Sequence, residues 1–381
     1  MSIVAPRRPA RLTLLVISLA TTPALAAPLY TIYNLGPVTN STAASGQGIS
    51  PSGNFATGFA NISAAGGGGS RAVLFSSATT TTSALPNLIS PARNFSQGRG
   101  VNDSGTIVGT GATTFFGSGG LPILWKNGVA TALPLPSGQT GGRAFSINNT
   151  EVSAGSVGGG SVEFAATFSP SGSAILTQTT VDGGRLVTAF AINDAGRVVG
   201  QALSPTNAAV TLPFYLDPTD PAATILPSLP GDNAGIAFAL ASNGFVAGSS
   251  SLNGANGKPF LWTPASGTTA VPLPTGATTG SARGVNRDGW VVGTASSAFA
   301  LPFLYDGLQT HLIQNLLANP AGWNLTTNTS SAALGIADNG NVVGQGLFNG
   351  VVSGYVLIPI PEPGSVAVLA VPMLALWRRR R

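Results

Sequence analysis

A short pattern that recurs seven times along the chain is the feature that most restricts its fold. Its four clearest copies combine an apolar residue, a polar turn, a glycine and a closing apolar pair with glycine, and they are Gly100–Gly109, Ala191–Gly200, Gly284–Gly293 and Gly335–Gly344. Weaker copies centre on Gly53, on Asn148 to Gly155, and on Gly244 with Gly248. The turn position recurs every 45 to 52 residues and is glycine in every copy but the third, where it is Glu151. Such a period is typical of an array or ring of similar supersecondary units.

Each copy carries the signals of a small antiparallel sheet. Asn and Asp bond to nearby backbone and Gly accepts a positive φ, so the turn should join two hairpin-paired strands. A later apolar run, often opened by proline, predicts a third strand. These runs are Ala72–Phe75, Pro122–Trp125, Ala165–Phe168, Pro213–Leu216, Pro259–Trp262, Pro302–Tyr305 and Gly354–Leu357. A fourth strand is predicted at the outer edge, because prolines suit an edge strand, at Ala132–Pro136, Ile225–Pro227 and Val271–Pro274.

Four short strands in each of seven repeats of about 48 residues predict an all-β fold, a seven-bladed β-propeller. The last repeat passes from its third strand at Tyr355–Leu357 directly into the C-terminal segment, whereas Tyr30–Gly36 precedes the first repeat as an unpaired fourth strand. We expect these two segments to pair and close the ring. A β-solenoid or a pair of sandwiches is the alternative, because glycine-rich loops such as Ala64–Ser70 are uneven in length.

The N-terminal segment has the features of a secretory signal peptide. Three arginines precede the apolar stretch Leu12–Ala20, and Ala24 and Ala26 are the small residues that a signal peptidase reads. We place the cleavage after Ala26, because a cut one residue later would put Pro28 at the scissile bond. Residues 1–26 are therefore predicted to be removed on export through the inner membrane.

The C-terminal segment, residues 361–381, has the features of a sorting signal. Pro361, Glu362 and Pro363 precede the apolar run Ser365–Trp377, whose 13 residues span ~20 Å as a helix, short of the ~30 Å hydrocarbon core. Four cations that stay on the cytoplasmic side follow this run: Arg378, Arg379, Arg380 and Arg381. The order of these elements resembles the PEP-CTERM tail of Gram-negative envelope proteins. That resemblance implies a short transmembrane helix and processing by an exosortase; an ordinary C-terminal anchor is the alternative.

Charge and cysteine content limit the remaining function classes. The formal net charge is +5, but seven of the 17 basic residues lie in the two terminal segments, which leaves 10 basic against 12 acidic residues from Ala27 to Trp377. Nucleic-acid binding is not expected, since it requires clustered cations that neutralise phosphates. The chain has no cysteine, so an exported domain spanning residues 27–360 must depend on its core alone.

The repeats also resemble those of the HAF-repeat family of extracellular bacterial proteins. The resemblance rests on the Ile-Asn-Asp-x-Gly-x-Val-Val-Gly segments, on the Pro-Phe-Leu-Trp of residues 259–262 and on the Gly-Trp-Asn-Leu of residues 322–325. Three positions depart from the pattern: Glu151 and Ser153 in the third copy, and Ala241 in the fifth. The resemblance implies a surface or secreted protein and does not imply an enzyme.

No arrangement of residues predicts catalysis, a cofactor or a metal site. His311 is the only histidine, in a fourth-strand context, and is expected at the surface. Asp103, Asp194 and Asp338 are each the single acid of a turn, too few ligands for calcium. Two close pairs in sequence, Asp217 with Asp220 and Arg287 with Asp288, are interpreted as solvated turns. Four tryptophans are expected to pack in the core rather than to stack on sugars: Trp125, Trp262, Trp290 and Trp323.

The sequence thus predicts a non-enzymatic protein of the envelope, outer surface or extracellular matrix that associates with exopolysaccharide and has exosortase and signal peptidase as partners. A polysaccharide hydrolase or lyase is the rival hypothesis, and a glycan-binding propeller without turnover is the third. The rival enzyme would use carboxylates and arginines around the channel mouth, and Arg99 and Arg283 are its best candidates. They hold a position that is apolar in other copies, as at Phe145, and are either channel-facing cations or exposed strand ends.

Overall fold

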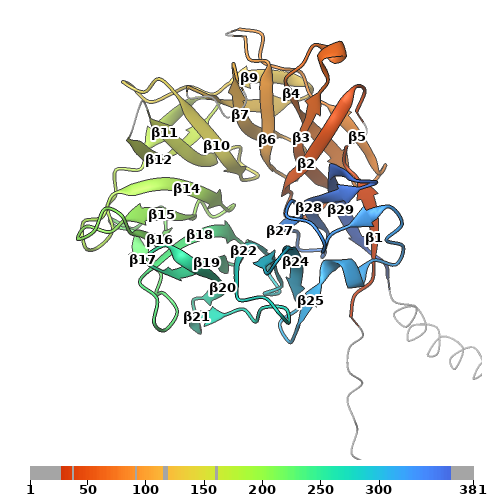
Figure 1. Ribbon diagram of the computed structural model, residues 1–381. Helices are drawn as coiled ribbons and strands as arrows, with labels where there is room; N and C mark the ends of the chain where they lie inside the picture. Colours follow the sequence, from red (N-terminus) through yellow and green to blue (C-terminus); the bar gives the residue numbers. More distant parts are fainter. Residues whose placement is uncertain (1–26, 37, 91, 115–118, 159–161, 362–381) are drawn as a thin grey trace, which may run out of the picture.

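Seven antiparallel blades, each built on four strands, surround a central axis in the computed structural model, which describes residues 27–36, 38–90, 92–114, 119–158 and 162–361 (Figure 1). The chain passes round the ring once, and one edge strand of each blade lies nearest the axis. The predicted seven-bladed β-propeller is confirmed. The signal-peptide residues Ala24 and Ala26, and all of the tail after Pro361, lie outside the described residues.

The blades are numbered along the chain, and each is given from its inner to its outer strand. Blade 1 is β2 (Ser41–Ile49), β3 (Phe55–Ile62), β4 (Ser70–Ser76) and β5 (Thr81–Ala84); blade 2 is β6 (Phe95–Val101), β7 (Ile107–Ala112), β8 (Leu121–Lys126) and β9 (Val129–Ala132); blade 3 is β10 (Gly142–Ile147), β11 (Ser153–Gly158), β12 (Glu163–Ser169) and β13 (Gly172–Ile175); blade 4 is β14 (Leu186–Ile192), β15 (Val198–Leu203), β16 (Thr211–Leu216) and β17 (Thr224–Ile225). Blade 5 is β18 (Ala234–Leu240), β19 (Val246–Leu252), β20 (Ala255–Thr263) and β21 (Gly267–Ala270); blade 6 is β22 (Thr279–Val285), β23 (Val291–Ser296), β24 (Ala300–Tyr305) and β25 (Thr310–Leu312); blade 7 is β27 (Ala332–Ile336), β28 (Val342–Phe348), β29 (Val351–Pro359) and β1 (Tyr30–Asn34). The short β26 (Trp323–Asn324) extends blade 7 beside β28, and two 3₁₀ turns, η1 (Ala64–Gly66) and η2 (Ile313–Leu316), lie in connections.

The N-terminal strand closes the ring, as predicted. β1 pairs antiparallel with β29 over five residues, from Tyr30 opposite Pro359 to Asn34 opposite Tyr355. Tyr30 and Leu35 at its two ends are fully buried. The first and last segments of the domain therefore share one sheet, so the propeller has no free terminal blade.

Seven hydrophobic clusters form the core of the described chain, one at each junction between neighbouring blades. At the junction of blades 4 and 5, for example, Val199 and Leu226 pack with Val246 and Phe260. Two tryptophans are buried in this core, as predicted: Trp125, whose Nε1 donates to the Pro86 carbonyl at 2.8 Å, and Trp323. The other two, Trp262 and Trp290, are half-buried against the same clusters.

The turn asparagines join one blade to the next. In blade 2, Asn102 Oδ1 accepts the N–H groups of Ser104 and Thr106, and its Nδ2 donates 3.1 Å to the carbonyl of Asn148 in blade 3. Equivalent bonds from Asn148, Asn193 and Asn286 bridge three more junctions. Where the motif lacks this asparagine, other turn groups bridge instead: Asn243, Asn341, and Ser52 with Asp103. Hydrogen bonds between turns thus cross every junction of the ring.

The third strands form where they were predicted, but their prolines lie inside the strand rather than at its first residue. Pro122 pairs with Thr110 of β7, and its carbonyl accepts the N–H of Leu133 on the outer side at 2.8 Å. In an antiparallel ladder the N–H and C=O of one residue point the same way, so the missing N–H of Pro122 faces outward and no bond to β7 is lost. Pro213 and Pro259 accept from the outer side in the same manner.

The fourth strands lie earlier than predicted. β9, β17 and β21 end at Ala132, Ile225 and Ala270, so the proline-containing residues that follow are connections to the next blade. The first residue of each such connection is buried and makes the bond to the third-strand proline: Leu133, Leu226 and Val271. The prolines end the strand because they cannot donate to a ladder.

Alanine at Gly196 should lower the free energy of unfolding by about 1–2 kcal/mol, because this turn residue has φ +75° and side chains are strained in that region. A Cβ there would make only ordinary contact with Pro218, so backbone strain is isolated from packing. Glu151 already occupies the equivalent position of blade 3 with φ +63°, and its carboxylate bonds to exposed Lys126.

Urea melts of the Gly196→Ala and Glu151→Ala proteins test this. The Glu151→Ala change should cost less, since a non-glycine residue is replaced by another and an exposed ion pair contributes ~0–1 kcal/mol. Equal losses in the two proteins would contradict the strain argument.

Candidate functional site

One residue of every inner strand lines a cavity at the centre of the ring, and it is the extra residue of a β-bulge. The pairing of each inner strand with its second strand shifts by one residue at this point in all seven blades. We call these seven residues the collar: Gln47, Arg99, Phe145, Phe190, Phe238, Arg283 and Leu334. A bulged residue is left out of the ladder and re-aims its side chain, which explains why the collar side chains differ in chemistry while the blades remain alike.

The glycine that closes the repeat motif makes the bulge possible. A Cβ on Gly109 would overlap the carbonyl oxygen of Gln97, which lies two residues before the bulged Arg99. The second-strand glycine of every other blade meets the corresponding carbonyl: Gly58, Gly155, Gly200, Gly248, Gly293 and Gly344. This close backbone approach is the physical reason for glycine at the end of Val-Val-Gly.

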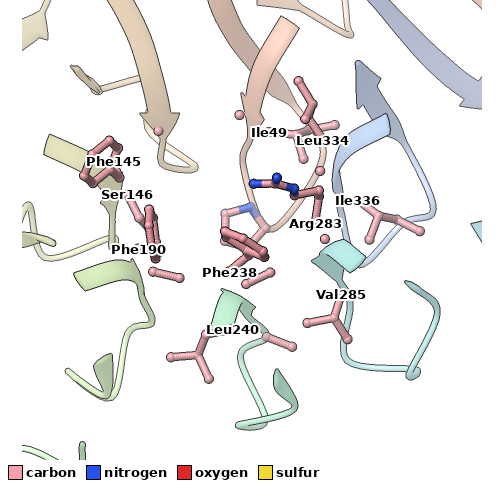
Figure 2. Close-up of a pocket in the computed structure, with 18 of the residues that line it drawn as sticks. Ile49, Phe145, Ser146, Phe190, Phe238, Leu240, Arg283, Val285, Leu334 and Ile336 are labelled. Carbon is pink, nitrogen blue, oxygen red and sulfur yellow. The ribbon is translucent and has the colours of Figure 1, made fainter. Parts of the chain in front are cut away.

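Phenylalanine rings cover one side of the collar (Figure 2). Phe190 lies between Phe145 and Phe238, with ring centroids 5.4 Å apart on each side. The guanidinium of Arg283 stacks on Phe238, 3.9 Å from the ring centroid, and its Nε donates to Ser281 at 3.1 Å. The three half-buried rings and Arg283 form a continuous wall across blades 3 to 6.

Amide groups surround the second arginine of the collar. Arg99 donates 3.0 Å to Gln47 Oε1 and 2.7 Å to Gln97 Oε1, and its Nε is buried with no partner among the described residues. Burial, and after it the charge of Arg143, lowers the pKa of the Arg99 guanidinium. Burial also lowers the pKa of Arg283, whose side chain is accessible from the channel but has protein on most sides.

Cavities lie on both sides of the collar. A cavity of about 180 Å³ on the turn side is lined by Phe145, Phe190, Phe238, Arg99 and Arg283 together with the residues that follow them. On the other side, a cavity of about 610 Å³ is lined by Gln47, Ser281 and Gln345, and one of about 410 Å³ by Gln47, Gln97 and Arg99. Arg283 and Arg99 each line one cavity on either side of the collar.

The turn acids serve the junctions between blades. Asp103 Oδ1 accepts the backbone N–H of Ser52 in blade 1 at 2.8 Å, and Asp194 and Asp338 accept those of Asn149 and Arg287. Burial opposes ionisation of Asp103, but the hydrogen bonds from Ser52 and Asn149 outweigh it and lower the pKa of this carboxyl. The three aspartates therefore bond to the preceding blade, whereas the hydrogen bonds within each turn are made by the asparagines.

Chelation should leave the melting temperature of the protein unchanged. The described residues contain no group of three or more His, Asp or Glu side chains that could hold a metal, and a ligand stabilises a fold only by binding it. Thermal melts with EDTA and with added calcium measure this, and Asp194→Asn serves as the comparison that weakens a turn without chelation. A fall of several degrees in EDTA would contradict the expectation and point to calcium at the aspartate turns.

His311 is in the predicted fourth strand, β25, but the expectation that it is a surface residue is wrong. Its side chain is only 12% exposed, and Nε2 lies 2.8 Å from Asp306 Oδ2. Burial disfavours the Asp306 carboxylate, yet hydrogen bonds from Gln309, His311 and Leu308 lower its pKa overall. This pair is remote from the collar and fastens the turn between β24 and β25. Asp217 likewise pairs with Arg197, at 2.8 Å.

The sequence indicated part of this site. Arg99 and Arg283 face the channel, the first of the two orientations considered for them, and the structure brings them into one collar. Gln47 and the three phenylalanines were not predicted as site residues. The signal that could have found them is their common place, one residue before a small residue and three before the turn, in every repeat.

No protein-family model matches this sequence, and a comparison with curated proteins also gives no match. Solved structures do match in fold. The β-propeller domain of the Trilobed protease from Pyrococcus furiosus, described as having an open velcro topology, is 8% identical with a TM-score of 0.52, over 84% of this chain and 94% of that one. YCF48 bound to D1 peptide is 10% identical with a TM-score of 0.51, over 90% and 98%.

TolB from Acinetobacter baumannii is 12% identical with a TM-score of 0.43; the match covers 88% of this chain and 63% of that one, so this chain spans less than two thirds of its length. Among the residues that the structure describes, no helix is long and apolar enough to cross a membrane. The similarities to known structures establish one conclusion: the chain is a β-propeller.

Proposed function

We propose that this protein is a non-enzymatic, exported propeller of the cell envelope or extracellular matrix that associates with exopolysaccharide. The observation that carries the proposal is the collar, in which two arginines and three phenylalanines face a common channel. Cations and aromatic rings at the centre of a rigid scaffold are suited to holding a ligand. Asp338, the one acid that lines the turn-side cavity among the described residues, accepts the N–H of Arg287 in the neighbouring blade, which supports binding rather than acid–base chemistry.

The two ends of the sequence support export and sorting. The signal-like N-terminus implies a signal peptidase, and the Pro361-Glu362-Pro363 tail implies an exosortase and passage through the membrane with the arginines inside. The HAF-repeat resemblance supports the same location. The closed ring fits this route, because a domain that seals its own edges needs no partner subunit for stability.

Incubation of the purified protein with the host's exopolysaccharide tests the proposal. Retention of the polymer without new reducing ends is the expected result. Absence of both retention and cleavage would contradict polysaccharide association.

A polysaccharide hydrolase or lyase is the second candidate, favoured by one observation: Arg99 and Arg283 both face the channel. Two carboxylates a few ångströms apart would be needed for hydrolysis, whereas Asp338 is the one acid that lines the 180 Å³ cavity among the described residues. New reducing ends in the same incubation would replace the binding proposal with this one.

Replacing Glu362 with glutamine should leave an unprocessed precursor held in the membrane, because the processing enzyme loses its recognition element while the apolar run and arginines are kept. Immunoblots of membrane and medium fractions measure the precursor, and Asp220→Asn is the control for loss of one acid elsewhere. Normal maturation of the Glu362→Gln protein would exclude the sorting interpretation.

A further inference from the structure

We propose that the collar binds a uronic acid residue of an acidic glycan, with Arg99 and Arg283 holding the carboxylate and ring oxygens and the Phe145–Phe190–Phe238 wall covering one face of the sugar. The inference rests on the proposed association with polysaccharide and names the ligand chemistry of the same channel. From blade 2 to blade 6 of the propeller, the collar residues are Arg99, Phe145, Phe190, Phe238 and Arg283. The two arginines therefore lie at the two ends of the aromatic wall.

The first argument is the charge of the collar. The ion pairs of the described chain are made by Lys126, Arg197, Lys258 and His311, and neither collar arginine takes part in one. Their protein partners are neutral: the amides of Gln47 and Gln97, and the hydroxyl of Ser281. For Arg99, whose Nε is buried, the lack of a counter-charge among the described residues is unfavourable, so a carboxylate that enters the channel gains more there than at the open surface. Arg283 is exposed to the channel and offers a second cation.

The second argument is the shape and chemistry of the cavity. At about 180 Å³ it is smaller than the ~300–1,000 Å³ pockets that enclose drug-sized ligands, so it suits a single ring. Half-buried phenylalanine faces accept the apolar C–H face of a pyranose, and they would add nothing to binding of a bare inorganic anion. A sugar ring that carries a carboxylate can pack against the phenylalanine wall and bond to the arginines at the same time.

The third argument is the set of amide and hydroxyl groups in the two cavities beyond the collar. Gln47, Gln97, Ser281 and Gln345 line them, and their amide and hydroxyl groups match the donors and acceptors of sugar hydroxyls. Because Arg99 and Arg283 line cavities on both sides of the collar, a sugar bound at the collar can be linked to a second sugar in one of the larger cavities. The site therefore favours the end of a glycan chain over a free aromatic acid, which has no groups for these amides.

Calorimetric titration of the purified protein with digalacturonate, galacturonate, galactose and benzoate tests the assignment. Digalacturonate should bind more tightly than galacturonate, and galactose at least about tenfold more weakly than galacturonate, since a charged hydrogen bond is lost. Arg99→Gln and Arg283→Gln should each weaken digalacturonate binding about tenfold or more. Both are compatible with the fold, because Gln47 is the natural collar residue of blade 1. Phe190→Leu, which copies Leu334, should weaken it as well.

Arg185→Gln is the matched control, because Arg185 also stacks on a phenylalanine, Phe164 at 4.8 Å, but outside the collar. Its affinity should equal that of the wild type. Equal binding of galactose and galacturonate, equal binding of benzoate and galacturonate, or unchanged affinity in the collar variants would each overturn the assignment.

Retention of the host polysaccharide by the same variants separates this inference from the proposed function. If the polymer is retained equally by wild type and collar variants, the association stands and the collar is not its site. If digalacturonate binds at the collar but the host polymer is not retained, the site stands and the proposed partner is wrong.

Discussion

Proline at Thr31 should open the ring and convert the protein into an aggregating species. The N–H of Leu35 donates to the Gly354 carbonyl, and the N–H of Ile360 donates to the Leu29 carbonyl. The backbone N–H and C=O groups of the odd-numbered residues between them therefore point toward β29. Proline at Thr31 removes one of these ladder bonds and places its ring against the partner strand. Once β1 separates, Tyr30 and Leu35 lose their burial and β29 becomes a bare edge, with a total loss of about 3 kcal/mol or more.

Thr31→Ala is the matched control, because the side chain is exposed and alanine keeps the N–H. Light scattering and thermal melts should show a soluble monomer for Thr31→Ala, and aggregation or loss of cooperative unfolding for Thr31→Pro and for a chain that starts at Ser41. An open solenoid would lose only the contacts of its end repeat. Equal solubility and nearly equal melting of all three proteins would therefore show that closure by β1 does not hold the ring.

Alanine at Gly200 is expected to lower the free energy of unfolding by about 3 kcal/mol. The new Cβ would overlap the carbonyl of Thr188 and meet the ring of Phe214, and backbone cannot rotate away as a flexible side chain does. Relief requires the bulge at Phe190 to flatten, which would move the middle ring of the aromatic wall.

Gly172→Ala provides the control, since no atom of the described residues lies within 4 Å of a Cβ there and its φ is not positive. Urea titration should give a clear loss for Gly200→Ala and almost none for Gly172→Ala. Phenylalanine ring signals in NMR spectra should shift only in the first protein. A small, equal effect in both would mean that the close approach of the two strands is not required.

The repeat architecture could be predicted because its causes are local in sequence. Turn residues recur with the period of the blade, apolar runs mark the third strands, and the missing fourth strand of the last repeat has its counterpart at Tyr30–Gly36. The fourth strands were misplaced because Leu-Pro segments resemble edge strands; in the structure the prolines mark where pairing stops. Where a fourth strand ends depends on which of its backbone groups face the third strand, and this cannot be read from the fourth strand alone.

The collar was harder to predict because a bulge breaks the alternation from which facing is inferred. Arg99 and Arg283 are cations at a position that holds Phe or Leu in four other repeats, whereas the residue type of Phe145, Phe190 and Phe238 does not separate them from core residues; only their place in the repeat does. His311 was misjudged for a related reason, since its partner Asp306 belongs to the preceding turn and only the fold shows that the pair is enclosed. Residues that make contacts between blades, such as Asp103 and Ser52, are a whole repeat apart in the sequence, so their pairing shows only in the fold.

Because the bulged residues are left out of the strand pairing, the side chains that line the channel can change while the blades keep their structure. Different blades carry glutamine, arginine, phenylalanine or leucine at this position, and the ladder shifts by one residue there in each of them. Seven such positions facing one axis form a combinatorial set, in which selectivity can be rewritten one blade at a time. A library randomised only at these seven codons should yield mostly folded proteins with divergent ligands, and the same freedom would let related chains diversify their cargo while keeping one scaffold.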